Sequence, residues 1–407
     1  MNAATHAPLL FKVQHGEIHI GGISINQLAA RLGTPFYAYD ASMIDQRIRE
    51  LRTALPSNIK LHYAIKANPY PPLLQRMSDW VDGGDIASSG ELAAALQAGF
   101  KAPTLSFAGP GKTDNELSKA LHAGITVNIE SAGEFERLCH IGQNLSIRPR
   151  LALRINPDFE LKGAGMRMGG GAKPFGIDAE QAPDILNKIK AKDVDFQGLH
   201  IFSGSQSLNS AAIAQAMSAA LALAKNLIQS SGLHCPHINL GGGLGIPYFP
   251  GEQRLELTPI GANIKQLLQE HADWLNNTQL ILEMGRYLVG EAGVYVTRII
   301  ERKTSRGETF LICDGGMHHH LALSGNLGQV IRKNYPVYLA NKADAPPEEI
   351  VNIHGPLCTP LDILGHKIAL PPANVGDLLV ITQSGAYGLS ASPIHFLSHN
   401  PPAEILL

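Results

Sequence analysis

Between about residue 36 and residue 286, short β-rich runs alternate with helical stretches, and this alternation constrains the fold more than any other feature of the chain. The runs are PFYAYD, LHYAIKAN, GGDIAS, TLSFAGP, ITVNIES, RLALRINP, FQGLHIFSGS, HINLGGGLG and QLILEMGR. Several of the helical stretches open with the S/T-x-x-E capping box directly after a run, at Ser88–Glu91, Thr113–Glu116 and Ser131–Glu134. Strand and capped helix repeated about eight times over about 250 residues predict an α/β protein with a closed parallel (β/α)8 barrel, the TIM barrel. A doubly wound open sheet is the alternative.

After residue 286 the pattern changes to β-rich runs joined by turns. VYVTRIIERK, ETFLICDGG, EEIVNIHG and GDLLVITQSGAYG follow one another with no strong helical stretch between them. We therefore expect three parts. Residues 1–34 form an amino-terminal strand segment joined to the β-domain, residues 35–286 form the barrel, and residues 287–407 form a C-terminal all-β domain.

Charge and cysteine usage exclude several classes of partner. A net charge of −2 over 407 residues predicts no nucleic-acid partner and no anionic membrane surface. We see neither a signal peptide nor an apolar run long enough to span a bilayer. The four cysteines lack CxxC spacing, which argues against a structural zinc or a disulfide framework. A cytoplasmic protein without a metal is the expectation.

In such a barrel, functional groups gather at the carboxyl ends of the strands. The polar or glycine residues expected there are Lys66, Asp85, Arg154, Ser205, Gly241, Gly242, Gly243, Glu283 and Arg286. Lys66 ends the run LHYAIK, where its apolar neighbours should remove water from the ammonium group. A desolvated amine has a lowered pKa and can attack a carbonyl, although a solvated lysine leaving a strand is the plainer interpretation of this residue alone.

The glycine run and the carboxylate indicate what such an amine would hold. Gly241-Gly242-Gly243 after a strand lets backbone N–H groups close on an anion, and its spacing fits neither common nucleotide-binding motif. A single small phosphate suits it better, with Ser205 and Arg286 as further ligands. Glu283, buried in a barrel mouth, could keep a proton on a heteroaromatic nitrogen. Amine, phosphate cradle and carboxylate together describe a site for pyridoxal 5'-phosphate.

The chain also resembles a known family. YAIKAN, GDIASSGEL, FAGPGKTDNEL, GLHIFSGSQ, NLGGGLG, EMGR, CDGG, GPLCTPLD and SGAYGLS occur in the order seen in the fold-type III pyridoxal-phosphate decarboxylases, the group of diaminopimelate, ornithine and arginine decarboxylases. The resemblance covers nearly the whole chain. It implies an alanine-racemase-like fold of barrel plus β-domain, and a homodimer with active sites shared across the interface.

The resemblance also implies roles, position by position. Lys66 matches the Schiff-base lysine, Glu283 the partner of the pyridine nitrogen, and Cys358 the residue that a second subunit supplies to protonate the product. Further matches to the cofactor pocket are Asp85, Arg154, Ser205, Gly241, Gly242, Gly243, Arg286 and Tyr387. Phe202 stands where these families usually have a histidine that stacks on the cofactor ring; phenylalanine keeps the stacking but cannot hydrogen-bond. Asp314 matches an acidic residue brought across the interface.

Two departures bear on the substrate. Where diaminopimelate decarboxylases have an arginine for the distal carboxylate, this chain has Ala322, and where the group has an acid after the cysteine, it has Thr359. A site lacking both is poorly suited to a free basic amino acid or diaminopimelate, because an unpaired charged end is costly to bury. The resemblance is instead to a subgroup acting on citryl-linked amino acids of siderophore synthesis or on aminoacyl carrier proteins.

The run His318-His319-His320 offers imidazoles for such a substrate, with a solvated loop as an equal alternative. A metal site is disfavoured because adjacent residues of an extended chain cannot all face one ion. We therefore predict a pyridoxal-phosphate decarboxylase of a conjugated amino acid, with His318, His319, Asp314 and Thr359 near the substrate. The alternatives are a decarboxylase of free diaminopimelate or a basic amino acid, a racemase of this fold, or a non-catalytic cofactor-binding protein.

Overall fold

The computed structural model describes residues 6–161, 163, 165–325 and 332–407. The chain divides into two compact units. The barrel unit comprises Ile48–Gly245 and Leu255–Gly285. The sheet unit comprises Met1–Arg47, Ile246–Arg254 and Arg286–Leu407.

The barrel unit contains the predicted closed parallel barrel of eight strands. In chain order they are β5 (Lys60–Ala64), β6 (Gly83–Ile86), β7 (Leu105–Phe107), β8 (Thr126–Ile129), β9 (Arg150–Asn156), β12 (Asp195–Ile201), β14 (His237–Asn239) and β15 (Gln279–Met284). All neighbouring pairs are parallel, β15 pairs with β5, and the β8–β9 pairing closes the ring. The small strand β11 (Ile177–Asp178) adds to β9, and β10 (Met166–Arg167) pairs with β13 (Gly204–Ser205). The closed barrel confirms the predicted fold class.

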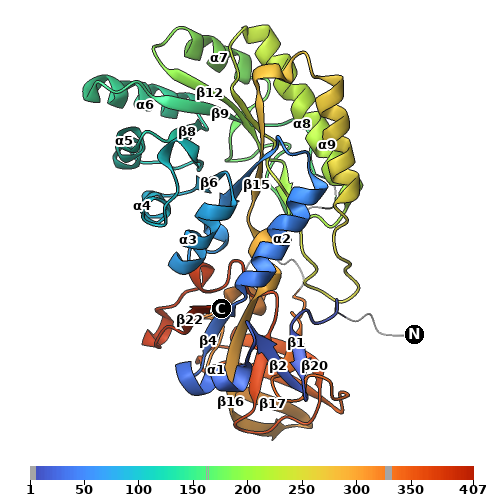
Figure 1. Ribbon diagram of the computed structural model, residues 1–407. Helices are drawn as coiled ribbons and strands as arrows, with labels where there is room; N and C mark the ends of the chain where they lie inside the picture. The colour runs from blue at the N-terminus through green and yellow to red at the C-terminus, as the bar shows by residue number, and fades with distance from the viewer. Residues whose placement is uncertain (1–5, 162, 164, 326–331) are drawn as a thin grey trace. The chain divides into compact units, whose positions relative to one another are not determined.

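Helices connect successive barrel strands and lie on the outside of the barrel, as the ribbon shows (Figure 1). They are α3 (Pro71–Trp80), α4 (Ser89–Gln97), α5 (Asp114–Ala123), α6 (Ala132–Leu145), α7 (Ala182–Lys190), α8 (Ser210–Ser231) and α9 (Thr258–Glu270). The hydroxyls of Ser88, Thr113 and Ser131 each accept a hydrogen bond from the backbone N–H three residues on, and Thr113 with Glu116 completes a capping box. Because these caps satisfy N–H groups that the helix itself leaves unpaired, they fix where each helix begins.

Helix α8 is long and apolar enough to cross a membrane by length and composition. The expectation that no run is long enough is therefore wrong by that criterion. Its apolar side, including Ile213, Met217, Leu221 and Ile228, is nonetheless buried, and the helix contacts α7 and α9. These contacts are those of a core helix of the barrel layer.

The sheet unit is built around the long strand β16 (Gly293–Ser305). The order of its main sheet is β18 (Val337–Leu339), β21 (Leu378–Ile381), β16, β17 (Glu308–Cys313), β19 (Glu349–His354) and β20 (Ile363–Leu370). A small sheet of β1 (Lys12–Gln14), β2 (Glu17–Ile20) and β3 (Ile23–Ser24) leads into helix α1 (Ile25–Leu32), which ends at Gly33. Apolar residues of β2 and α1 pack with Val294, Val296 and Val380 in one core.

One strand prediction is wrong. The run PFYAYD was assigned to the barrel, but it forms β4 (Phe36–Tyr39), which pairs antiparallel with β16 and parallel with β22 (Ala403–Leu406). All four β4 residues are buried, so the strand has the continuous apolar texture of a barrel strand while lying in a mixed sheet. Helix α2 (Ala41–Ala54) follows it in the chain. The remaining eight runs each supply one barrel strand.

Candidate active site

Lys66 and Glu283 lie together at the carboxyl ends of two neighbouring barrel strands. Lys66 follows β5 in a single 3-10 turn, Ile65–Ala67, and Glu283 is the fifth residue of β15. The Lys66 Nζ atom is 3.6 Å from Glu283 Oε1. The Lys66 side chain is 47% exposed whereas that of Glu283 is 7% exposed. The expectation that neighbouring residues strip water from the Lys66 ammonium is therefore wrong, because only the carboxylate partner is buried.

The carboxylate of Glu283 is held ionised by its neighbours. Burial alone would raise its pKa, but the charge of Lys66 and the contact with His200 outweigh burial and lower the pKa. Arg154 adds to the same effect. His200 Nε2 is 3.3 Å from Glu283 Oε2, so the two carboxylate oxygens face an amine and an imidazole respectively. An ionised, buried acid beside an amine is the arrangement that a protonated pyridine nitrogen needs.

Asp85 and Arg154 are both buried in the barrel, each held by a partner that the sequence analysis did not predict. Asp85 accepts a 2.5 Å hydrogen bond from Ser106 Oγ and lies 3.5 Å from His62 Nδ1, while its second oxygen has no hydrogen-bond partner in the described part of the chain. Arg154 Nη1 is 2.8 Å from the buried Glu130 Oε1. Glu130 follows β8, and its place at a strand end was the signal that could have found it.

The glycine run after β14 is a turn that only glycine permits. Gly241 and Gly243 have φ of 70° and 80°, in the left-handed region. A Cβ on Gly242 would lie 1.9 Å from the Glu283 carbonyl oxygen, and one on Gly241 would lie 2.8 Å from the ring of Phe202. The turn thus places its backbone against the Glu283 carbonyl at the end of β15 and lets the Phe202 ring pack close to Gly241. The centroid of the Phe202 ring lies 5.9 Å from Lys66 Nζ. Ser205 lies in β13, which follows Phe202 in the same segment.

In the sheet unit, the guanidinium of Arg286 packs against aromatic side chains, one of which is Tyr387. Arg286 Nη1 donates a 2.8 Å hydrogen bond to Tyr248, and the guanidinium carbon lies 4.7 Å from the Tyr387 ring centroid. Arg286 Nε has no hydrogen-bond partner among the residues that the structure describes. A buried guanidinium with an unused N–H is suited to an anion, so the geometry of both residues fits the predicted phosphate ligands.

Asp362, the last residue of the motif GPLCTPLD, holds two loops of the sheet unit together. Its Oδ1 accepts a 2.7 Å hydrogen bond from the Met317 N–H, and its Oδ2 accepts one of 2.8 Å from the Leu357 N–H. A Cβ on either Gly316 or Gly355 would come within 2.4 Å of this carboxylate. Asp362 is 1% exposed, and it therefore fixes the loop before the histidine run against the loop that carries Cys358.

Replacing Asp362 by alanine should lower the free energy of unfolding by about 3 kcal/mol, because two buried N–H groups lose their acceptor. Urea denaturation of the purified protein measures this. The substitution Leu361→Ala changes an exposed side chain in the same turn and is the control, with an expected change of at most about 0.5 kcal/mol. Equal stability of Asp362→Ala and Leu361→Ala would show that the carboxylate does not hold the loops.

The remaining predicted substrate residues are placed as follows. Asp314 accepts hydrogen bonds from Thr34 Oγ1, Thr297 Oγ1 and the Arg298 N–H, at 2.5, 2.7 and 2.9 Å, so its carboxylate is used within the sheet unit. Cys358 is an exposed free thiol, whereas the next residue, Thr359, is half-buried and its hydroxyl accepts a 3.3 Å hydrogen bond from the Leu361 N–H. Their roles toward a substrate stay predictions.

His318, His319 and His320 are all buried, at 0, 1 and 0% exposure, so the alternative of a solvated loop is wrong. His319 Nε2 lies 3.0 Å from the Asn400 carbonyl oxygen, and His320 Nε2 lies 3.1 Å from Ser384 Oγ. The His318 ring packs at a tilt against the rings of His319 and His399, with centroid distances of 3.7 and 4.9 Å. Desolvation lowers the three pKa values to about 3, about 4 and about 3, which leaves neutral rings at pH 7 rather than cations.

These histidines predict a loss of stability in mild acid. The unfolded chain binds protons at an ordinary histidine pKa near 6.5 while the folded chain does not, so stability is present above that pH and falls as pH drops toward the folded values. His318→Phe removes one titrating ring and should reduce the dependence of the unfolding free energy on pH by about 1.4 kcal/mol per pH unit below pH 6. Urea unfolding at pH 5, 6 and 7 measures the slope. An unchanged slope would mean that His318 is protonated in the folded protein.

The barrel residues fit pyridoxal phosphate on structural grounds. Lys66 offers an amine to an aldehyde, the ionised Glu283 beside it suits a ring nitrogen, and Phe202 presents an aromatic face. The glycine turn leaves backbone where any side chain would clash. Asp85 Oδ2, buried and without a partner in the described residues, is a further group open to a ligand.

Comparison with known proteins agrees with this fit. The chain matches the family described as pyridoxal-dependent decarboxylase, pyridoxal binding domain, over residues 41–290. It is 40% identical over 388 residues to the L-glutamyl-[BtrI acyl-carrier protein] decarboxylase of Niallia circulans, covering 94% of this chain and 90% of that protein. It is 31% identical to a diaminopimelate decarboxylase of Aquifex aeolicus, covering 96% and 91%.

A third relative and a solved structure extend the comparison. The 2-[(L-alanin-3-ylcarbamoyl)methyl]-2-hydroxybutanedioate decarboxylase of Staphylococcus aureus is 30% identical, covering 91% of this chain and 93% of that one. The crystal structure of diaminopimelate decarboxylase from M. jannaschii with L-lysine aligns with a TM-score of 0.89 at 25% identity, covering 98% of this chain and 92% of that chain.

Proposed function

This chain belongs to the pyridoxal-dependent decarboxylase family, and from that premise we propose that it removes the carboxyl group of an amino acid carried on a larger molecule. The substrate classes are an aminoacyl group on a carrier protein and a citryl-linked amino acid. When bound, pyridoxal phosphate supplies an electron sink for the pair released as CO2 leaves.

We assign a separate role toward the cofactor to each of these residues of the barrel unit. Lys66 would hold the cofactor through its amine and exchange it for the substrate amine. Glu283 would keep the ring nitrogen protonated, supported by its ionised state beside Lys66 and His200. Phe202 would hold the ring plane by packing alone, because it lacks the imidazole usual at that position. Asp85, Arg154, Ser205 and the turn Gly241–Gly243 would complete the pocket.

One observation carries the choice of a conjugated substrate: neither loop of the sheet unit offers a charged group for a free amino acid's second end. The segments 314–325 and 355–362 contain no lysine or arginine. Both of their carboxylates are engaged within the unit, Asp314 by hydroxyls and a backbone N–H, and Asp362 by two backbone N–H groups. Ala322, at the expected place of the arginine clamp, is buried. The 40% identity to a carrier-protein glutamyl decarboxylase supports the same choice.

The test is CO2 release by the purified holoenzyme from matched substrates. Glutamyl carrier protein and citryl-diaminopropionate are compared with free glutamate, diaminopimelate, ornithine and lysine at equal concentration. We expect turnover only with one of the conjugated substrates. Fast turnover of free diaminopimelate would contradict the proposal and favour the second candidate, which the 31% identity to a diaminopimelate decarboxylase keeps in view.

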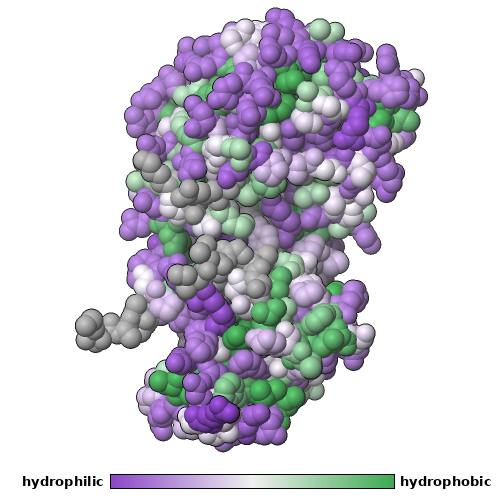
Figure 2. Space-filling model, turned by 180° about the vertical axis from the view of Figure 1, so that it is seen from behind, coloured by the Kyte–Doolittle hydropathy of each residue, from purple (hydrophilic) through white to green (hydrophobic). Residues whose placement is uncertain are grey.

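We further propose that the enzyme is a cytoplasmic homodimer in which Cys358 of one copy completes the site of the other, as the resemblance implies. An exposed thiol is consistent with that role. Exposed apolar side chains offer surface for association; in the sheet unit they are Ile300, Ile350, Leu361, Val375, Phe396 and Leu397. Figure 2 shows apolar side chains gathered in larger groups on the sheet unit, the lower part of the view, than on the barrel unit.

Mixing two inactive variants tests the shared site. Lys66→Ala and Cys358→Ala should each be inactive alone, yet dissociating and reassociating an equal mixture should recover about a quarter of wild-type turnover, because half of the dimers then contain one intact site. Mixing Lys66→Ala with wild type that has been treated in the same way is the control. No recovery from a mixture shown to be dimeric would place Cys358 outside the partner's site.

A further inference from the structure

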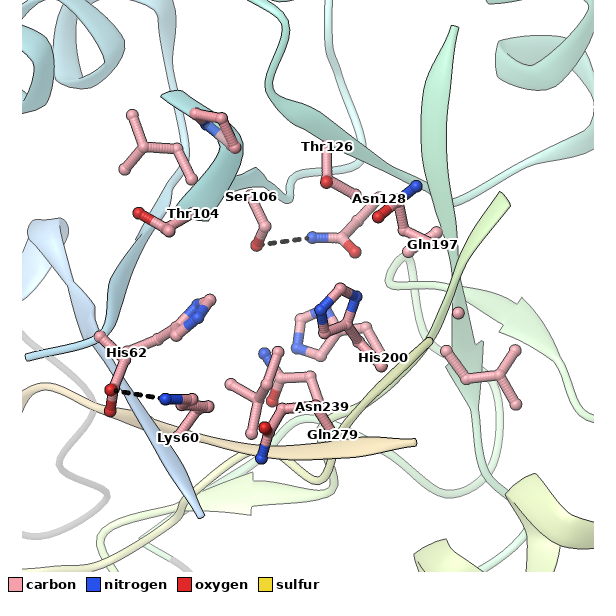
Figure 3. Close-up of a pocket in the computed structure, with 18 residues that line it drawn as sticks. Lys60, His62, Thr104, Ser106, Thr126, Asn128, Gln197, His200, Asn239 and Gln279 are labelled. Carbon is pink, nitrogen blue, oxygen red and sulfur yellow. Dashed lines mark hydrogen bonds and ion pairs between the residues drawn. The ribbon is translucent and has the colours of Figure 1, made fainter. Parts of the chain in front are cut away.

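The interior of the barrel below Lys66 and Glu283 is polar, where a (β/α)8 barrel is usually filled with branched apolar side chains. The inward-facing residues of this level include His62 on β5, Ser106 on β7, Asn128 on β8, His200 on β12 and Asn239 on β14. They surround a chamber of about 310 Å³, drawn in Figure 3. That volume has room for on the order of ten water molecules.

The chamber lies at the amino-terminal ends of the strands, away from the ends that carry Lys66 and Glu283. Its lining includes the first residues of five strands, namely Lys60, Leu105, Thr126, His237 and Gln279. Lys60 and Pro103 at this rim are exposed, so the chamber meets solvent there. Lys60 is paired with Asp82 at 3.2 Å, which leaves the amides, hydroxyls and imidazoles as the groups facing inward.

Two imidazoles link this chamber to the carboxylates above it. His200 lines the chamber and its Nε2 is 3.3 Å from Glu283 Oε2. His62 lines it from the opposite side, as Figure 3 shows, and its Nδ1 is 3.5 Å from Asp85 Oδ1. His200 is 2% exposed, and neither ring nitrogen has a hydrogen-bond partner among the residues described, the contact of Nε2 with Glu283 being one of distance alone. A buried ring nitrogen without a protein partner, beside a polar cavity, is the site of an ordered water.

We propose that the chamber is hydrated and that His200 connects it to Glu283, so that protons reach and leave this carboxylate through the amino-terminal end of the barrel. When Nδ1 accepts a proton from chamber water, Nε2 can release its own proton to Glu283 Oε2, and reversal of the steps returns it. His200 is thus a positioning residue, acting on the cofactor only through Glu283.

The charged groups around the contact between His200 and Glu283 determine whether the proton rests on the carboxylate. On Glu283, Lys66 and Arg154 act with His200 to favour the ionised carboxylate. Asp85 with His62 forms the second carboxylate–imidazole contact, and His237 at the rim is the third imidazole of the chamber. Because these neighbours favour the ionised carboxylate, the proton does not rest on Glu283, and the proposed route carries it through the imidazole and a chamber water.

The inference rests on the cofactor of the proposed function but not on the identity of the substrate. Its test uses holoenzyme containing pyridoxal phosphate labelled with 15N in the ring. NMR saturation transfer then measures how fast the ring-nitrogen proton, expected to be held by Glu283, exchanges with water. Binding of the cofactor and CO2 release are measured separately, so that failure of the proposed function is seen independently of failure of this inference.

The decisive variant changes Ala152, which lines the chamber from β9 and is distinct from both Lys66 and Glu283. Ala152→Leu fills the chamber with apolar volume and Ala152→Ser is the matched control that keeps it polar. We expect exchange about a hundredfold slower in Ala152→Leu and in His200→Leu, the lower end of what a positioned proton-transfer group contributes, with Ala152→Ser unchanged.

His200→Gln keeps a hydrogen-bonding side chain without a titrating ring and should bind the cofactor normally while slowing exchange to the same degree. Should Ala152→Leu fail to fold, Thr126→Val, on β8 at the rim, removes a chamber hydroxyl instead, and the His200 variants still give the answer. Wild-type exchange rates in His200→Leu and His200→Gln holoenzyme would overturn the inference, because protons would then enter from the side where Lys66 is exposed. A high-resolution structure with a dry chamber would overturn it as well.

Discussion

Replacing Lys66 by alanine should lower kcat by about 10⁴-fold, since in the proposed mechanism this amine holds the cofactor and exchanges it for the substrate amine. The geometry supports this size of effect because Lys66 Nζ lies 3.6 Å from Glu283 at the carboxyl ends of the barrel strands, where the proposed cofactor would be held. The variant should also lose the visible absorbance of the bound cofactor. Both are measured on the same preparation, by CO2 release and by absorbance after incubation with pyridoxal phosphate.

Two lysine variants sharpen the result. Lys66→Arg keeps a positive charge beside Glu283 but cannot bond to the aldehyde, so it should be as inactive as Lys66→Ala. Lys60→Ala removes the lysine that begins the same strand and should leave turnover unchanged, because Lys60 is exposed and paired with Asp82. Substantial turnover in Lys66→Ala would remove this residue from the chemistry.

Glu283→Gln should lower kcat by about 10² to 10³-fold, comparable to the loss of one preorganised electrostatic group in an active site. The amide has nearly the same shape, so the barrel should fold, but it carries no charge to keep the ring nitrogen protonated. Steady-state CO2 release with the best conjugated substrate is the measurement. Glu283→Asp keeps the charge one methylene farther away and should lose less activity than Glu283→Gln.

The pH profile gives a second check on Glu283. Its lowered pKa means that the carboxylate is ionised across the neutral range, so kcat should show no titration of this group between pH 6 and pH 8. If Glu283→Gln retained wild-type kcat, the carboxylate would not be the partner of the ring nitrogen.

The barrel could be predicted from local sequence because each repeat carries its own signals. The capping residues Ser88, Thr113 and Ser131 begin their helices as predicted, and eight of the nine β-rich runs are barrel strands. The ninth, at Phe36–Tyr39, failed because it is buried on all sides in either sheet. Local texture distinguishes a buried strand from an exposed one, but not which buried sheet it joins.

The residues of the candidate site could be predicted from the sequence, but their exposure and their contacts with one another could be predicted less well. Lys66 and Glu283 lie at strand ends, as the pattern indicated, and the closed barrel brings them within 3.6 Å. The half-exposed state of Lys66 and the contact of Glu283 with His200 depend on register between strands far apart in the chain. Register is fixed by tertiary packing, so periodicity cannot supply it.

The histidine run shows the same limit. Adjacent imidazoles look polar in the sequence, yet His320 reaches Ser384 and His319 reaches Asn400, more than sixty residues away. Hydrogen bonds to these distant partners offset the free-energy cost of burying a polar ring. No local sequence pattern predicts such partners.

Borohydride reduction of the holoenzyme followed by peptide mapping tests the central claim most directly. We predict that the reduced cofactor is found on the peptide containing Lys66, with none on the peptide of Lys60. Label on any other lysine, or no label in a protein that binds pyridoxal phosphate and releases CO2, would contradict the assignment of Lys66 and with it the roles given to Glu283 and His200.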